Sequence, residues 1–228
     1  AATMLRDVVY LMSRTKDASK KRVFFKIQSI GSRSLPIFRK AFPDTPWIFV
    51  YRDPTEVLMS HMEAGKRANC LQSQRHPPQR IVDIVKQYSN DEKDPERLTP
   101  AQYCAAHLAT LTEIAVKELK QSDSVALGLA VNYRDLPNLV LDTILPNIWK
   151  IGMDEAARAR MQKGSSSYSK GRGNKAGVAF EGDSEQKHKK ASADVKLAAH
   201  LFLEPSFREL EILANAAKEK ISMETTIQ

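Results

Sequence analysis

Short apolar runs alternate along this chain with longer segments in which apolar and polar positions repeat at a helical spacing. Continuous runs rich in aromatic and β-branched residues are typical of buried strands, and they occur at residues 23–28, 47–51 and 125–131. The helical spacing predicts helices over residues 3–14, 35–41, 54–65, 101–121, 137–148, 154–163, 190–203 and 206–222. Apolar strands separated by helices favour parallel pairing in a sheet that is covered on both faces. We therefore expect an α/β fold in three layers, with a central, mainly parallel sheet flanked by helices.

Two stretches interrupt this alternation. Residues 66–98 are rich in Gln, Pro and charge, and they predict an irregular insertion, which is usually functional or mobile. Residues 164–188 are rich in Ser, Gly and Lys without periodicity, so we expect a basic flexible loop that becomes ordered with a ligand. At 228 residues the chain can bury one sizeable core, and we expect residues 1–228 to form a single domain.

The strand predicted at residues 47–51 ends abruptly in Arg52-Asp53-Pro54, and a helical pattern follows at once. Pro54 suits the first position of that helix. Arg52 therefore lies at the carboxyl end of a strand, and Ser60 lies about two turns into the next helix. Ligands of open α/β sheets bind at this edge, and a guanidinium near a hydroxyl and a helix N-terminus suits an anion such as phosphate.

The net charge of +8 favours acidic partners, and the basic residues gather between residues 158 and 196. Aromatic residues are few and are not interleaved with this basic run, which argues against a nucleic-acid partner because base stacking needs them. No apolar run reaches the roughly 18 residues of a membrane-spanning helix. Oligomeric state cannot be read from these features.

Cys70 and Cys104 are the only cysteines. They could form one disulfide, although their spacing does not indicate one. Two cysteines are too few for a small scaffold held together by disulfides. So few cysteines favour a reducing compartment, and hence the cytoplasm. The chain begins with Ala1 inside a helical pattern, so we expect the natural protein to extend further upstream.

The segment Tyr-Arg-Asp-Pro-Thr-Glu-Val-Leu-Met-Ser at residues 51–60 resembles the 3′-phosphate-binding segment of sulfotransferases. In that family an Arg at a strand end and a Ser eight residues later hold the 3′-phosphate of 3′-phosphoadenosine 5′-phosphosulfate (PAPS). Arg52 and Ser60 have that spacing. The resemblance implies the P-loop NTPase-like fold of the family, in which PAPS, or the product 3′-phosphoadenosine 5′-phosphate (PAP), lies across the strand ends.

Two later segments extend the resemblance. Residues 132–136 resemble the strand end whose Tyr lies near the adenine, which maps to Tyr133. Residues 169–173 resemble the basic glycine loop that closes over the same phosphate. That loop maps to Lys170 and Gly171, and Arg172 is expected to assist them.

The sequence also departs from the family pattern. The family's first signature is a phosphate loop with a Lys after the N-terminal strand, and nothing before Val23 matches it. Many cytosolic members carry Lys-x-His at the end of the next strand, where the His deprotonates the acceptor. Here Lys26 is kept, but Gln28 stands in place of the His and cannot take a proton at neutral pH. We expect Lys26 to stabilise negative charge during transfer.

The resemblance predicts transfer of a sulfuryl group from PAPS to a hydroxyl or amine of a small-molecule or glycan acceptor, which enters beside residues 66–98. No metal is required, since positioning and electrostatic stabilisation supply most of the catalysis. The missing phosphate loop and Gln28 favour an alternative, a non-catalytic nucleotide- or polyanion-binding protein. At the residue level, Arg52 could instead pair with Asp53 or Glu56 at the helix start, and Tyr133 could be a packing residue.

Overall fold

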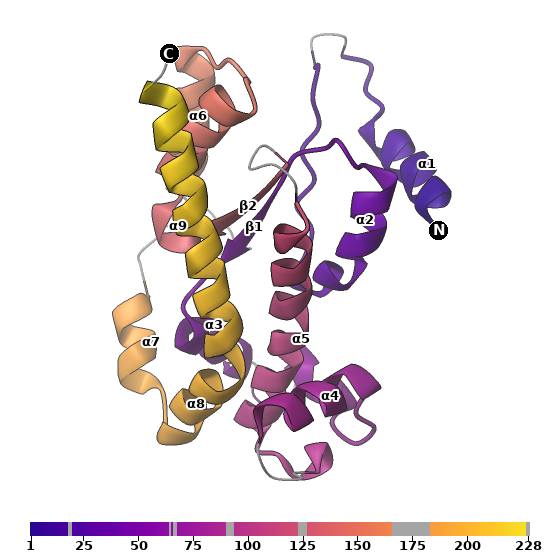
Figure 1. The fold of residues 1–228 in the computed structure, drawn as a ribbon, viewed down its shortest axis with the longest axis vertical. Helices are drawn as coiled ribbons and strands as arrows, with labels where there is room; N and C mark the ends of the chain where they lie inside the picture. Colours follow the sequence, from indigo (N-terminus) through magenta and orange to yellow (C-terminus); the bar gives the residue numbers. More distant parts are fainter. Residues whose placement is uncertain are drawn as a thin grey trace, which may run out of the picture.

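The computed structural model describes residues 1–17, 20–63, 65, 68–89, 94–122, 127–165 and 183–226, most of them helical (Figure 1). The helices in this part of the chain are α1 (Ala2–Ser13), α2 (Leu35–Ala41), α3 (Pro54–Met62), α4 (Gln79–Tyr88), α5 (Pro100–Lys120), α6 (Glu155–Ser165), α7 (Ser184–Lys190), α8 (Ala193–Ala198) and α9 (Glu204–Thr226). Helical segments with tighter or wider turns are η1 (Ser29–Ser34), η3 (Asn69–Ser73), η4 (Pro95–Arg97), η5 (Tyr133–Asp135), η6 (Val140–Ile148) and η8 (Ala199–Leu203).

The sheet has two strands within the described residues, β1 (Trp47–Tyr51) and β2 (Gly128–Asn132). They run parallel, as the sequence predicts, with Trp47 opposite Gly128 and Tyr51 opposite Asn132. The expected three-layer α/β fold with a central sheet is nevertheless wrong. Two strands make too narrow a sheet to form a layer, and most of the buried side chains lie between helices instead.

The strand expected at residues 23–28 is absent. This segment is irregular, and Val23 and Phe24 are 50% and 60% exposed. Its apolar and aromatic content predicts a strand, but a strand also needs a neighbour that satisfies its backbone hydrogen bonds. No neighbouring strand pairs with it in the described part of the chain, although the Phe24 ring stacks against Trp149.

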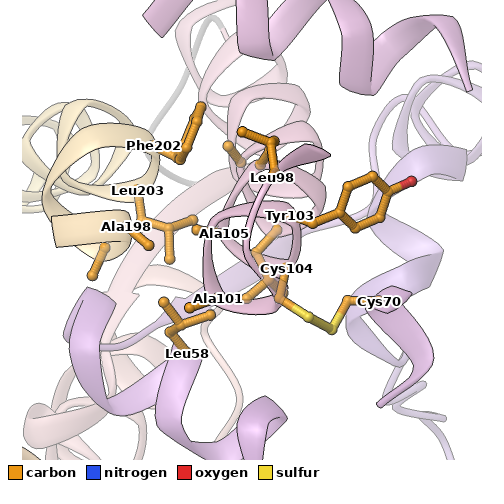
Figure 2. Close-up of a cluster of buried hydrophobic side chains, with 14 of the residues drawn as sticks. Leu58, Cys70, Leu98, Ala101, Tyr103, Cys104, Ala105, Ala198, Phe202 and Leu203 are labelled. Atoms are coloured by element: carbon orange, nitrogen blue, oxygen red, sulfur yellow. A yellow bond between two sulfur atoms is a disulfide. The ribbon is translucent and has the colours of Figure 1, made fainter. Parts of the chain in front are cut away.

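Helix α5 forms the centre of the largest core. It begins at Pro100, close to the predicted start at residue 101, and the Thr99 hydroxyl accepts a hydrogen bond from the Gln102 amide within a capping box. Small buried residues on α5 let its neighbours approach closely, as Figure 2 shows for the side chains around Ala101 and Ala105. The partners come from α3, α8 and η8, and they are Leu58, Ala198, Phe202 and Leu203.

Helices cover both faces of the two-stranded sheet. On one face, Tyr51 and Ala130 pack against α5 and against Leu210 of α9, which lies beside the strands in Figure 1. On the other face, Leu129 and Val131 pack against η6. This packing fixes the direction in which both strands end.

Two predictions about the connecting segments need correction. Residues 66–98 are not irregular throughout, because α4 lies within them and buries Ile81, Ile84 and Val85 at a helical spacing. The Pro and Gln residues around α4 concealed this short apolar pattern. The expected basic loop at residues 164–188 contains the end of α6 and the first five residues of α7, while residues 166–182 lie outside the described residues.

A disulfide joins Cys70 of η3 to Cys104 of α5, and both residues are buried (Figure 2). Disulfides of this kind are typical of proteins that fold in oxidising compartments. The structure therefore does not support the expectation of a reducing compartment. Among the described residues, no helix combines the length and apolarity that crossing a bilayer requires.

Candidate anion-binding site

The parallel register brings the ends of the two strands together. Tyr51 lies opposite Asn132, so Arg52 and Tyr133 follow side by side at the carboxyl edge of the sheet. The Arg52 guanidinium lies over the Tyr133 ring, 4.9 Å from its centroid. This distance allows a cation–π interaction, which holds the guanidinium close to the aromatic face.

Helix α3 begins directly after Arg52. The Asp53 side chain caps it by accepting a hydrogen bond of 3.0 Å from the Glu56 amide, and Pro54 occupies its first position. Glu56 is buried and accepts a hydrogen bond from Nε of Arg52. The helix-start ion pair that the sequence left open as an alternative therefore forms with Glu56.

A second element, α7, supplies the other half of the cluster. One carboxylate oxygen of Asp183 lies 2.7 Å from Nη2 of Arg52, and its other oxygen lies 2.7 Å from Nζ of Lys187. The Lys187 ammonium also donates a hydrogen bond of 2.6 Å to the Ser60 hydroxyl on α3. Arg52 and Lys187 thus share one carboxylate, and Ser60 is bound to Lys187. We call Arg52, Ser60, Asp183 and Lys187 the Arg52 cluster.

The charges of the Arg52 cluster stabilise one another. Burial lowers the pKa of Arg52, but its hydrogen bonds with Asp183 and Glu56 outweigh that effect and raise the pKa. Burial likewise raises the pKa of Asp183, but hydrogen bonds from Lys187 and Arg52 outweigh it and lower the pKa. Both side chains are therefore charged at neutral pH, and the carboxylate is held as an anion between two cations.

A neighbouring network ties the strand ends to α9. Glu211 accepts hydrogen bonds of 2.6 Å from the Tyr51 hydroxyl and 2.7 Å from the Asn132 amide. It also pairs with Arg134 at 2.9 Å. The residues that precede Arg52 and Tyr133 are therefore fixed by one carboxylate, which makes this edge of the sheet rigid.

Asp53, Glu56 and His188 are the described residues that could hold a metal. One ligand atom from each lies within 4.8 Å of the others, and such a nitrogen and oxygen set suits a divalent cation. Ion pairs already account for this proximity. Nε2 of His188 lies 3.2 Å from Asp53, while Glu56 pairs with Arg52.

The structure brings together only some of the residues that the resemblance selects. Arg52, Ser60 and Tyr133 meet at the same edge of the sheet through the contacts above. Lys26 lies on the irregular segment before η1, where it is exposed and does not end a strand. The glycine-loop residues Lys170, Gly171 and Arg172 lie outside the described residues.

Sequence reasoning missed the contribution of α7. Lys187 belongs to the basic run between residues 158 and 196, which was the only signal for it, and nothing in the sequence singles out Asp183. Their contacts with Ser60 and Arg52 span 127 and 131 positions of the chain. Pairings over such distances depend on the fold and leave no local pattern.

A groove in the described part of the chain lies elsewhere. It has a volume of about 760 Å³ between α4, α5 and α9, and its lining includes Tyr88, Glu113 and Pro205. No member of the Arg52 cluster lines it. The cluster at the strand ends is therefore separate from this groove.

No protein-family model matches the chain, and no curated protein or solved structure shows a significant match to it. The function must therefore be argued from the Arg52 cluster and from the sequence pattern.

Proposed function

We propose that this chain is a sulfotransferase-like protein that binds the 3′-phosphate of PAPS, or of its product PAP, at the Arg52 cluster. The observation that carries the proposal is the convergence of Arg52 and Lys187 on a single anionic group at the carboxyl edge of the sheet, with the Ser60 hydroxyl bound to Lys187. Two cationic side chains and a hydroxyl are the groups that recognise phosphate elsewhere. The resemblance of residues 51–60 to the 3′-phosphate segment of sulfotransferases supports the same ligand.

Tyr133 extends the site beyond the phosphate. Its ring lies beside the Arg52 guanidinium, and the residue is 36% exposed. An exposed ring next to a phosphate position offers a surface for stacking a base. In this proposal, the adenine of the nucleotide packs near Tyr133 while Arg52 holds the 3′-phosphate.

Transfer is the second part of the proposal. An acceptor hydroxyl or amine forms a bond to sulfur as the bond between sulfur and the bridging phosphate oxygen breaks, which releases PAP. Lys26 supplies positive charge for the oxygen that leaves. The acceptor is a small molecule or a glycan, and because Gln28 takes no proton, the proton that the acceptor loses passes to water.

A second candidate is a non-catalytic protein that binds nucleotides or polyanions with the same cluster. The exposure of Lys26 on an irregular segment favours it, because a catalytic cation is usually held in place by its surroundings. A sulfuryl-transfer assay with labelled PAPS and a panel of hydroxyl and amine acceptors separates the two. Binding of PAPS without transfer to any acceptor supports the non-catalytic protein.

The test of binding is calorimetry with PAP on the wild type and on Arg52→Ala. We expect the substitution to weaken binding by about tenfold or more, since a charge-assisted hydrogen bond contributes about 1.5–3 kcal/mol. Arg208→Ala is the matched control, because the exposed Arg208 pairs with a Glu four residues earlier on α9, far in sequence from the strand ends. Equal affinity of wild type and Arg52→Ala, with both proteins folded by circular dichroism, contradicts the proposal.

A further inference from the structure

We infer that Asp183 is an internal ligand that occupies the phosphate position, and that Lys187 becomes a direct phosphate ligand when Asp183 turns away. This inference rests on the proposed function, because it concerns how the same site is kept closed and then opened. It adds one binding residue, Lys187, and one inhibitory residue, Asp183, that the resemblance to sulfotransferases does not supply.

The geometry of Asp183 is that of a bound anion. Its two oxygens separately contact Nη2 of Arg52 and Nζ of Lys187, each at 2.7 Å. Two oxygens of a phosphate can make the same pair of contacts, since both groups present negatively charged oxygens to cationic donors. The Ser60 hydroxyl accepts a hydrogen bond of 2.6 Å from the same ammonium and donates one of 3.0 Å to the Glu56 carbonyl, so it helps to hold the ammonium in place.

Charge explains why Asp183 must leave. The two cations Arg52 and Lys187 share Asp183, and Arg52 also pairs with the buried Glu56, so two cations meet two carboxylates. These charges already balance while Asp183 occupies the site, so a doubly charged phosphate finds no net positive charge there. When Asp183 turns away, the group carries one net positive charge and both cations are left without their shared partner.

The two side chains of this ion pair differ in exposure, so Asp183 can leave the pair for water and Lys187 cannot. The side chain of Lys187 is 8% exposed, whereas that of Asp183 is 44% exposed. Asp183 can therefore rotate into water, while the Lys187 ammonium stays buried and requires an anion. Phosphate and Asp183 compete for the same two cations, and the site holds one of them at a time.

The test is calorimetry with PAP and with inorganic phosphate on the wild type, Asp183→Asn and Asp183→Ala. We expect both variants to bind PAP about tenfold more tightly, since removing the competitor removes a charge-assisted interaction. Inorganic phosphate should gain by a similar factor, because the competition concerns the phosphate group alone. Glu185→Ala is the matched control: Glu185 is an exposed carboxylate on the same helix, paired with Lys189, and its loss should leave binding unchanged.

The contribution of Lys187 is tested in the background that lacks its partner. We expect Lys187→Met combined with Asp183→Asn to bind PAP about tenfold less tightly than Asp183→Asn alone. Thermal melts of each variant, with and without phosphate, establish that the proteins are folded. A phosphate-dependent rise in melting temperature should be larger in Asp183→Asn than in the wild type.

The outcomes separate this inference from the proposed function. If Arg52→Ala weakens PAP binding but folded Asp183→Asn and Asp183→Ala bind no better than wild type, the internal-ligand inference is overturned and the nucleotide site stands. If no variant binds PAP, both are overturned. If Asp183→Asn binds PAP equally tightly with and without Lys187→Met, Lys187 is not a phosphate ligand.

Discussion

At the scale of single residues, two buried ionisable sites in the described part of the chain differ in whether a partner compensates for burial. The Arg52 cluster places two cations against carboxylates. His107 lacks such compensation: its Nδ1 is buried and has no hydrogen-bond partner among the described residues. Burial first, and then repulsion from Arg33, His61 and Arg80, lowers the pKa of His107 to about 4. The imidazole is therefore neutral in the folded protein at neutral pH.

The pH dependence of stability follows from this lowered pKa. The unfolded chain protonates His107 near pH 6.5, while the folded protein does so only near pH 4, so the unfolded state binds more protons between these values. We expect the free energy of unfolding to fall by about 2–3 kcal/mol as the pH drops through this window. Urea unfolding at several pH values measures it. In His107→Gln this pH-dependent loss of stability should disappear. If the free energy of unfolding varies with pH in the same way in His107→Gln and in the wild type, this account is contradicted.

At the scale of elements, the site depends on how α3, α7 and α9 dock on the ends of two strands. Helix α7 has only seven residues, which is too short to be stable in isolation, so its contacts with α3 hold it in place. On the other side of the strand ends, α9 is attached through Glu211, which accepts hydrogen bonds from Tyr51 and Asn132. These two attachments position Arg52 and Tyr133.

Glu211→Ala tests the attachment of α9. We expect a loss of about 2–3 kcal/mol in the free energy of unfolding, because the substitution leaves Tyr51 and Asn132 without their acceptor. Glu219→Ala, at an exposed position of the same helix, should change the stability by less than about 0.5 kcal/mol. Equal losses in the two variants would show that Glu211 does not carry the attachment.

Local signals predicted these elements well, because their causes are local. Thr99-Pro100 and Asp53-Pro54 mark the starts of α5 and α3, and the caps form as their sequences indicate. The prediction of a strand at residues 23–28 was wrong because pairing decides whether an apolar run becomes a strand.

In the site, the parallel register made the meeting of Arg52 and Tyr133 foreseeable. The contacts from α7 were not foreseeable, since they join residues more than a hundred positions apart.

At the scale of the whole molecule, helix packing around α5 supplies most of the core, and a disulfide closes the loop between η3 and α5. The expected α/β architecture required more strands than the described part of the chain contains. A covalent link over 34 positions restricts the unfolded chain, and it joins the segment that carries α4 to the central helix. The molecule therefore depends on oxidation as well as on burial.

Cys70→Ser measures the contribution of this link. We expect it to lower the free energy of unfolding by about 4 kcal/mol, the value that loop-closure entropy gives for a loop of this length. A reducing agent should destabilise the wild type to a similar extent and leave Cys70→Ser unaffected. If the reducing agent does not change the wild-type melting curve, the disulfide does not contribute to stability in solution.

The most direct test of the central claim is the affinity of PAP for Asp183→Asn with and without Arg52→Ala. The single variant removes the competing carboxylate but keeps both cations, and the double variant then removes the guanidinium. Our account predicts one nucleotide per chain in the single variant and a loss of about tenfold or more in the double variant. The same affinity in both proteins would contradict a phosphate site at the ends of the two strands.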